Sequence, residues 1–230
     1  MNWDVMISSV PTLLSGVPLT VQLVGLGEIL GLAIACLATW GRLSGNLAAA
    51  GVSRLYVFVF RGTPLLVQIY LIYYGLGQFP AVRESFLWPL LREPYWCAIL
   101  ALALNTGAYT SEILRGAIQS IPQGQVEAAR ACGMGRLLMF RRIIVPIAIR
   151  QALPAYGNEI ILMVKASSLA SIITLLEITG LARRLIPQTY AVFEIFIVAG
   201  LIYLGLNFAI AQAVRWAEWR LTPHLRARAS

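Results

Sequence analysis

Three ionisable residues lie within or beside apolar stretches of this sequence, where a charge is costly and is usually retained for a function. Glu28 and Lys165 are the only charges within residues 17–39 and 160–176, and Glu112 follows a third such stretch. A buried carboxylate can attract a cationic ligand or carry protons, and an ammonium group can bind a carboxylate as a point charge. These residue types indicate binding or movement of a charged solute.

Each of these charges also has a structural interpretation. Glu28 either attracts a cationic substrate or forms a buried pair or hydrogen bond that fixes a dimer. Lys165, followed by Ser167 and Ser168, either binds a substrate carboxylate or pairs with Glu159, and the pairing is favoured.

A polar face is predicted on the third apolar segment. Asn105, Tyr109 and Glu112 are spaced i, i+4, i+7 and therefore share one side of a helix. Such a face suits either a translocation path or packing between subunits. For Arg61, near the start of the second apolar segment, a structural pair or snorkelling is favoured over substrate contact.

The common catalytic and metal-binding motifs are absent from the sequence. A P-loop needs Gly-Lys-Ser/Thr, but the sole lysine, Lys165, follows Val164, and there is no Gly-x-Ser-x-Gly elbow. The only histidine is His224, and the three cysteines are far apart: Cys36, Cys97 and Cys132. We therefore expect no catalytic residues, no metal site and no ATPase site in this chain.

The composition shows which elements must position these residues. The chain has 230 residues, of which 59% are hydrophobic and 12% charged, with a mean hydropathy of +0.75. Too little polar surface remains for a soluble enzyme or a disordered chain. Spans of ~20 residues give about five membrane helices. They are expected around residues 17–39, 62–82, 95–111, 160–176 and 195–214.

The arginines predict the orientation in the membrane. Twelve fall in the segments 40–54 and 115–150 and in the tail from residue 215, whereas the loops on the opposite side hold four. The positive-inside rule then places the N-terminus outside and the C-terminus in the cytoplasm. This rule also accounts for the net charge of +8 without a nucleic-acid partner.

The long connection placed in the cytoplasm contains a predicted short helix. Residues 127–140 are mostly good helix formers, with Glu127 near the expected start and Arg141 and Arg142 at the expected end, as the helix dipole favours. Pro146 is expected to fix the turn into the fourth span.

This connection also carries a motif. It resembles the EAA signature of permease subunits in bacterial ABC importers, with a single change at Val145, and the matching residues are Glu127, Ala128, Ala129, Gly133, Ile143 and Pro146. In that family the element is the coupling helix that docks on the ATPase. The small residues suit such close approach, whereas a solvated amphipathic helix is the alternative interpretation.

Two further segments resemble polar amino-acid permeases. One is the sequence RGTPLLVQ at residues 61–68, which begins with Arg61, Gly62, Thr63 and Pro64. The other is NTGAY at residues 105–109, followed by Glu112. The similarity covers residues 10–220, approximately, and is strongest to subunits that import histidine, basic amino acids, glutamine or opines.

The resemblance implies an all-α membrane protein with one transmembrane domain over residues 1–230 and a coupling loop at about 120–146. It implies five spans, a second identical or paralogous permease subunit, two ATPases that bind ATP and Mg²⁺, and a periplasmic binding protein. We therefore predict a multi-pass subunit of the bacterial inner membrane. It would import polar, mainly basic, amino acids or opines by alternating access, without a cofactor of its own.

Two rival functions stay open on the sequence alone. One is an ion-gradient-driven secondary transporter in which Glu28 and Glu112 are the coupling carboxylates, although the chain is short and shows no inverted repeat. The other is a membrane scaffold whose cytoplasmic loop only recruits a partner.

Overall fold

Helices account for nearly all of the described chain. The computed structural model describes residues 2–221, and this part contains helices and turns but no strand. Three helices are long and apolar enough to cross a bilayer alone: α2 (Val17–Leu43), α7 (Pro94–Gln119) and α12 (Val192–Leu221).

Two bent helix pairs are candidates for further crossings. One joins α3 (Leu47–Gly62) to residues 65–78, and the other joins residues 136–173 to α11 (Ile178–Thr189). Counting each pair as one span gives up to five spans. The predicted all-α membrane fold with about five helices is therefore confirmed.

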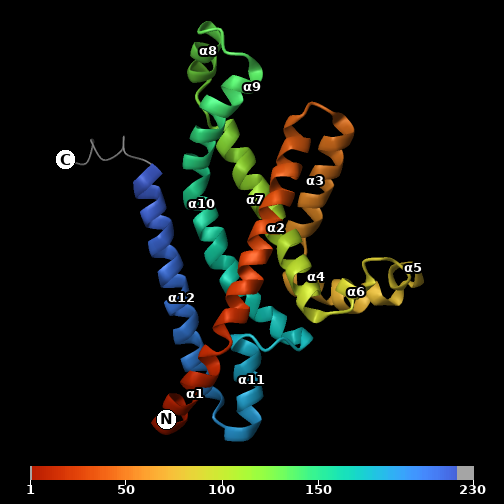
Figure 1. Cartoon of the computed structure of the whole chain (residues 1–230), viewed down its shortest axis with the longest axis vertical. Helices are drawn as coiled ribbons and strands as arrows, with labels where there is room; N and C mark the ends of the chain where they lie inside the picture. The colour runs from red at the N-terminus through yellow and green to blue at the C-terminus, as the bar shows by residue number, and fades with distance from the viewer. Residues whose placement is uncertain (1, 222–230) are drawn as a thin grey trace, which may run out of the picture.

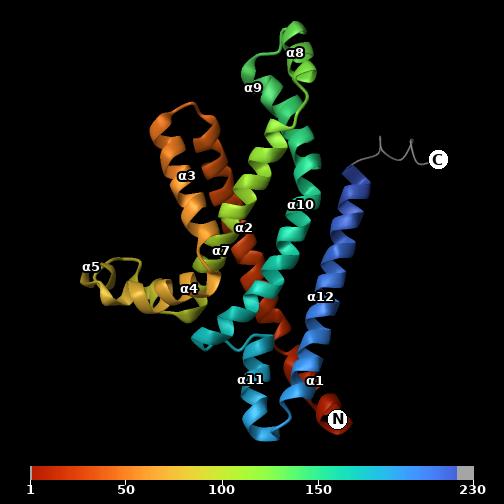
Figure 2. The ribbon, with the colours of Figure 1, turned by 180° about the vertical axis from the view of Figure 1, so that it is seen from behind.

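The helices run lengthwise in an elongated bundle (Figures 1 and 2). The short helices α8 (Gln123–Ala131) and α9 (Arg136–Met139) lie at one end, and α1 (Trp3–Leu14) lies with α11 at the other. The described end of α12 points toward the α8 side, as an odd number of crossings requires. Which end faces the cytoplasm stays a prediction, and Arg226 and Arg228 of the predicted tail lie outside the described residues.

The second crossing differs from the predicted window 62–82. The long part of this crossing is α3, which packs beside α2 after a short turn at residues 44–46. The chain then bends by 106° at residues 63–64. Past the bend, α4 (Leu65–Tyr70) leads into a lateral arm that carries α5 (Pro80–Arg83) and α6 (Trp88–Leu91) (Figure 1).

Proline chemistry explains this bend. Pro64 lacks an N–H donor and disfavours helical geometry at the preceding residue, and Thr63 is accordingly extended, with φ −115° and ψ 145°. The amide of Gln68 satisfies the freed groups by donating to the carbonyls of Phe60 (2.9 Å) and Thr63 (3.0 Å). The break is thus built into the RGTPLLVQ segment.

Pro146 does not form the predicted turn into the fourth span. It lies near the start of α10 (Val145–Ala166), inside a helical run that extends from α9 to residue 173. A π-helical stretch, Phe140–Ile144, comes directly before α10. The wider turns of this stretch allow the helix to continue although Pro146 has no backbone N–H to donate.

Close packing of α2 on α7 forms the centre of the bundle. A Cβ atom added at Gly31 would lie 2.2 Å from the Thr106 side chain, and one at Gly107 would lie 3.1 Å from the carbonyl oxygen of Gly31. Small residues permit this approach, as is usual between membrane helices. The apolar core around this contact is formed mainly by residues 97–102 of α7 with Leu23 and Met163.

Candidate functional site

A cavity of about 520 Å³ lies where α3 bends into α4. Its remaining walls come from the middle of α7, the second half of α10 and the turn that follows α10. The lining residues are Arg61, Gly62, Thr63, Pro64, Leu65, Asn105, Tyr109, Glu159, Leu162, Met163, Ala166 and Leu169. The bend therefore joins the RGTP and NTGAY segments, which are distant in the sequence, at one site.

One wall of the cavity is polar and cationic. The Asn105 amide donates to the Gln68 side-chain oxygen (3.0 Å) and to the Phe60 carbonyl (3.3 Å). The guanidinium carbon of Arg61 lies 5.1 Å from the centre of the Tyr109 ring, a cation–π contact. Arg61, for which substrate contact was not favoured, is thus held by Tyr109 in the cavity wall.

The cavity lining also contains a carboxylate, Glu159 of α10. This residue is 8% exposed and accepts a hydrogen bond from the Thr106 hydroxyl (3.2 Å). The sequence pattern predicted Glu159 only as a partner of Lys165, although an acid within an apolar stretch is itself a sign of function. A guanidinium and a carboxylate in one cavity can hold a ligand that carries both charges.

Lys165 and the two serines lie away from this cavity. Lys165 is exposed and lines a second hollow of about 290 Å³, together with Ser168, Thr179, Phe196, Ala199, Gly200 and Tyr203. The favoured Lys165–Glu159 pair is wrong, because the ion pairs of residues 2–221 do not include it. The Ser167 hydroxyl is buried and donates to the Val164 carbonyl (2.8 Å).

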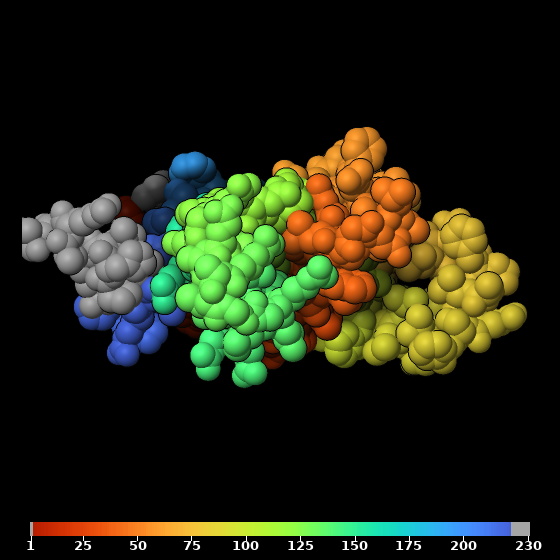
Figure 3. Space-filling view, turned by 90° about the horizontal axis from the view of Figure 1, so that it is seen from above, coloured from red at the N-terminus to blue at the C-terminus, as the bar shows by residue number. Residues whose placement is uncertain are grey.

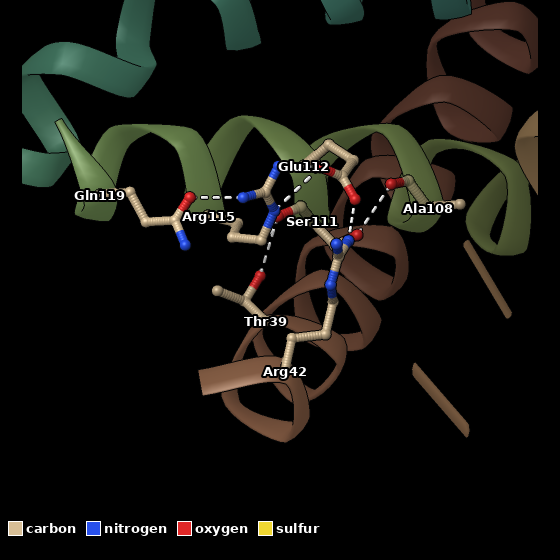
Figure 4. Close-up of polar contacts among 7 residues, drawn as sticks. All are labelled: Thr39, Arg42, Ala108, Ser111, Glu112, Arg115 and Gln119. Carbon is tan, nitrogen blue, oxygen red and sulfur yellow. Dashed lines mark hydrogen bonds and ion pairs between the residues drawn. The ribbon is translucent and has the colours of Figure 1, made fainter. Parts of the chain in front are cut away.

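Glu112 lies in a charged network at the α8 end of α2 and α7 (Figure 4). One carboxylate oxygen pairs with Arg42 of α2, and the other accepts from Arg115 Nη2 (2.7 Å) and Nε (3.0 Å). Arg115 also donates to Gln119. Two cations thus compensate Glu112, and the carboxylate is absent from the cavity lining. This arrangement argues against Glu112 as a proton or cation carrier.

Glu112→Gln should destabilise the protein, because two partly buried guanidinium groups lose their shared anion. The three side chains are 17–29% exposed, so we expect a loss of about 2 kcal/mol. Thermal unfolding in detergent measures it. The matched control is Glu93→Gln, whose pair with Arg92 is more than half exposed and should contribute almost nothing. Equal melting temperatures for Glu112→Gln and wild type would contradict a stabilising role.

The predicted coupling loop forms the far end of the bundle, where the α8–α9 segment covers the centre of the face in Figure 3. Glu127 and Ala128 of α8 are exposed, whereas Ala129 is buried. Leu137 in α9 is 80% exposed. These exposed residues lie on short helices outside the long ones, at an end of the bundle that is open to a protein partner.

The short helix of this loop is not the predicted 127–140. It spans Gln123–Ala131, so Glu127 lies at its middle, and Arg141 and Arg142 belong to the π-helical stretch before α10. The reason is Gly133, which has φ +73°. The N–H of Met134 bonds to the Ala129 carbonyl (3.1 Å) and that of Gly133 to the Arg130 carbonyl (2.9 Å), the pattern of a glycine C-cap.

Apolar contacts connect α8 to the long helices. One buried cluster contains Ala117 of α7, Ile121 of the turn after α7, and Ala148 of α10. Val126 of α8 packs against this cluster. The Ser120 hydroxyl also donates to the Gln151 side chain (2.5 Å). The predicted coupling helix thus packs on a cluster to which the helices that carry Asn105, Tyr109 and Glu159 contribute. Ile143 lies in the π-helical stretch between the two regions.

Comparison with known proteins relates this arrangement to transport systems. Residues 29–223 match the family model described as binding-protein-dependent transport system inner membrane component. The octopine transport system permease protein OccM of Rhizobium radiobacter is 57% identical over 218 residues, 93% of this chain and 87% of that protein. The nopaline transport system permease protein NocM of Agrobacterium fabrum is 54% identical over 229 residues, which are 99% of this chain and 95% of that protein.

A solved structure is similar as well. The crystal structure of an amino acid ABC transporter with histidines matches with a TM-score of 0.85 and 34% identity, over 96% of this chain and 99% of that chain. These findings support the ABC-permease prediction and not the gradient-driven alternative. The chain belongs to the family of inner-membrane permease components of binding-protein-dependent ABC transport systems.

Proposed function

We propose that this chain is the membrane-spanning permease subunit of an ATP-driven importer for opines or basic amino acids. The observation that carries the proposal is the cavity between α3, α7 and α10, in which Arg61 and Glu159 present opposite charges. Opines and amino acids combine a carboxylate with a cationic nitrogen. Arg61 would bind the carboxylate, Glu159 the cation, and Asn105 and Tyr109 would complete the polar wall.

The relatives support the choice of substrate class. The names of the two relatives above contain octopine and nopaline. Both compounds are arginine derivatives with carboxylate groups. Glu28 is buried and is not among the residues that line either hollow. The hollow at Lys165 and Ser168 would be a further part of the path, where the ammonium group can meet a carboxylate.

Transport would be driven through the loop 120–146. In the proposed cycle, separate ATPase subunits bind ATP and Mg²⁺ and close, moving α8 through contacts at Glu127, Ala128 and Leu137. The cluster against which Val126 packs would pass this motion to the cavity, which opens in turn to each side of the bacterial inner membrane. This chain would supply path and coupling, with no ATPase site of its own.

The proposed assembly also contains a second permease subunit and a periplasmic binding protein. The test is to purify the tagged chain with its partners in mild detergent and to measure ATP hydrolysis with each candidate binding protein, loaded or empty. We expect a co-purifying ATPase that one loaded binding protein stimulates. Substrate uptake by this chain without any bound ATPase would overturn the proposal.

A further inference from the structure

Glu177 is a fully buried acid at the start of α11. One carboxylate oxygen accepts from the N–H of Gly180 (2.8 Å). The other accepts from the N–H of Thr179 (2.9 Å) and from the hydroxyl of Tyr203 in α12 (2.6 Å). Three donors stabilise the charged form of a carboxylate. Glu177 thus caps α11 and fixes the position of the Tyr203 hydroxyl.

Two of these partners, Thr179 and Tyr203, line the second hollow. A tyrosine hydroxyl has a single proton, and Tyr203 donates it to Glu177. In the contact of 3.1 Å between the two hydroxyls, Thr179 is therefore the donor. Ser168, a third hydroxyl of the lining, donates to the Lys165 carbonyl (2.6 Å). Because all three protons are used within the protein, these hydroxyls can only accept hydrogen bonds from a ligand.

Lys165 brings the opposite chemistry to the same hollow. Its side chain is exposed, and the ion pairs found in residues 2–221 do not include it. An ammonium group has three donors and no acceptor. The remaining lining residues, Phe196, Ala199 and Gly200, have no polar side chain. The second hollow therefore combines one cationic donor with a group of neutral acceptors.

We propose that the second hollow is a binding site for the zwitterionic head group that amino acids and opines share. The ligand carboxylate pairs with the Lys165 ammonium, and the ligand ammonium donates to the hydroxyl oxygens of Tyr203 and Thr179. Glu177 is a positioning residue, because it takes the Tyr203 proton and so makes this hydroxyl an acceptor. The site rests on the proposed function, which supplies the ligand, and it shares no lining residue with the cavity at Arg61.

Protection of a cysteine in the second hollow tests whether the hollow binds substrate. Gly200 lines the hollow, and a Cβ atom added there meets nothing within 4 Å, so Gly200→Cys should be tolerated. The protein is the permease–ATPase complex in which the exposed Cys36 and Cys132 are replaced by alanine. Arginine should slow the reaction of Gly200→Cys with N-ethylmaleimide. Gly205→Cys is the matched control, equally open and on the same helix but outside the lining, and should react equally with and without arginine.

Two arginine analogues identify which end of the ligand each side chain binds. Agmatine lacks the carboxylate, and N-acetylarginine lacks the α-ammonium. Lys165→Gln should raise the arginine concentration that half-protects Gly200→Cys about tenfold, the effect of one charge-assisted hydrogen bond, and should leave that of agmatine unchanged. Tyr203→Phe should raise the arginine concentration by a similar factor and leave that of N-acetylarginine unchanged. Tyr190→Phe, at a tyrosine that is 89% exposed, should change neither concentration.

The positioning role of Glu177 has its own readout. Glu177→Gln keeps the size of the side chain but supplies an N–H donor in place of an acceptor oxygen. It should weaken protection by arginine and not by N-acetylarginine, as Tyr203→Phe does. The double variant should lose little more than either single variant, because Glu177 acts through Tyr203. Additive losses, or equal losses for both ligands, would show that Glu177 only stabilises the fold.

The outcomes separate this site from the importer function. Equal reaction rates of Gly200→Cys with and without arginine would overturn the second site. Equal losses for arginine and agmatine in Lys165→Gln, or for arginine and N-acetylarginine in Tyr203→Phe, would refute the assigned contacts. If a loaded binding protein stimulates the ATPase of the wild-type complex while arginine gives no protection, the second site fails and the importer function stands.

Discussion

Gly133→Val is expected to abolish most substrate uptake while the partner ATPase still hydrolyses ATP. Gly133 has φ +73° and its N–H closes the C-cap of α8. A β-branched residue resists this conformation, at a cost of about 1–3 kcal/mol. The end of α8 should therefore unwind or tilt, and the surface around Glu127 would lose its fit to the ATPase. We expect uptake into proteoliposomes to fall at least roughly tenfold, the equivalent of 1.4 kcal/mol.

Two controls separate the coupling role from general damage. Gly133→Asn should keep most of the uptake, because asparagine tolerates a positive φ. Gly45→Val imposes the same backbone strain at φ +74°, but in the turn between α2 and α3, and should uncouple transport far less. Wild-type uptake by well-expressed Gly133→Val would refute the role assigned to this loop.

Glu159→Gln is expected to weaken binding of a cationic substrate with little effect on a neutral one of the same shape. The amide keeps the size of the side chain and removes the charge that faces the cavity. A charge-assisted hydrogen bond contributes about 2 kcal/mol, so the affinity for arginine should fall roughly 30-fold. Calorimetry on the permease–ATPase complex without binding protein gives this number directly.

Citrulline is the matched ligand for this measurement, because it replaces the guanidinium of arginine by a neutral urea group. Its binding should change little in Glu159→Gln. The exposed Glu84 provides the control variant, Glu84→Gln, which should bind arginine as the wild type does. Equal losses for arginine and citrulline would show that Glu159 does not recognise the cation.

The sequence predicted what depends on composition and local spacing. Hydrophobic stretches long enough for a bilayer can only be helices there, because every backbone group must find its partner within the segment. The number of spans and the helical class followed from this rule. The motif around Gly133 could be found as well, because it is defined by the spacing between Glu127 and Gly133 in the sequence. Finding it requires no knowledge of the fold.

Local spacing was less reliable where a single residue redirects the chain. Pro64 bends the second crossing by 106°, so the apolar window 62–82 covers only its second part, and α3 forms the first part. Pro146, a residue of the same type, lies within a continuous helix after the π-helical stretch 140–144. The outcome depends on whether neighbouring groups, such as the amide of Gln68, satisfy the freed backbone atoms, and these contacts are not readable from the proline itself.

Composition and hydropathy established a helical membrane protein with charged residues in its spans, and the motifs predicted a permease. Which of these charges meet became visible in the folded chain. There Glu112 pairs with Arg42 and Arg115, Lys165 lies apart from Glu159, and Glu159 and Arg61 line one cavity. The physical reason is that the role of a charge inside the bundle depends on the group it pairs with. When the two groups are on different helices, helix packing decides whether they meet, and here the close contact of α2 with α7 and the bend at Pro64 do so.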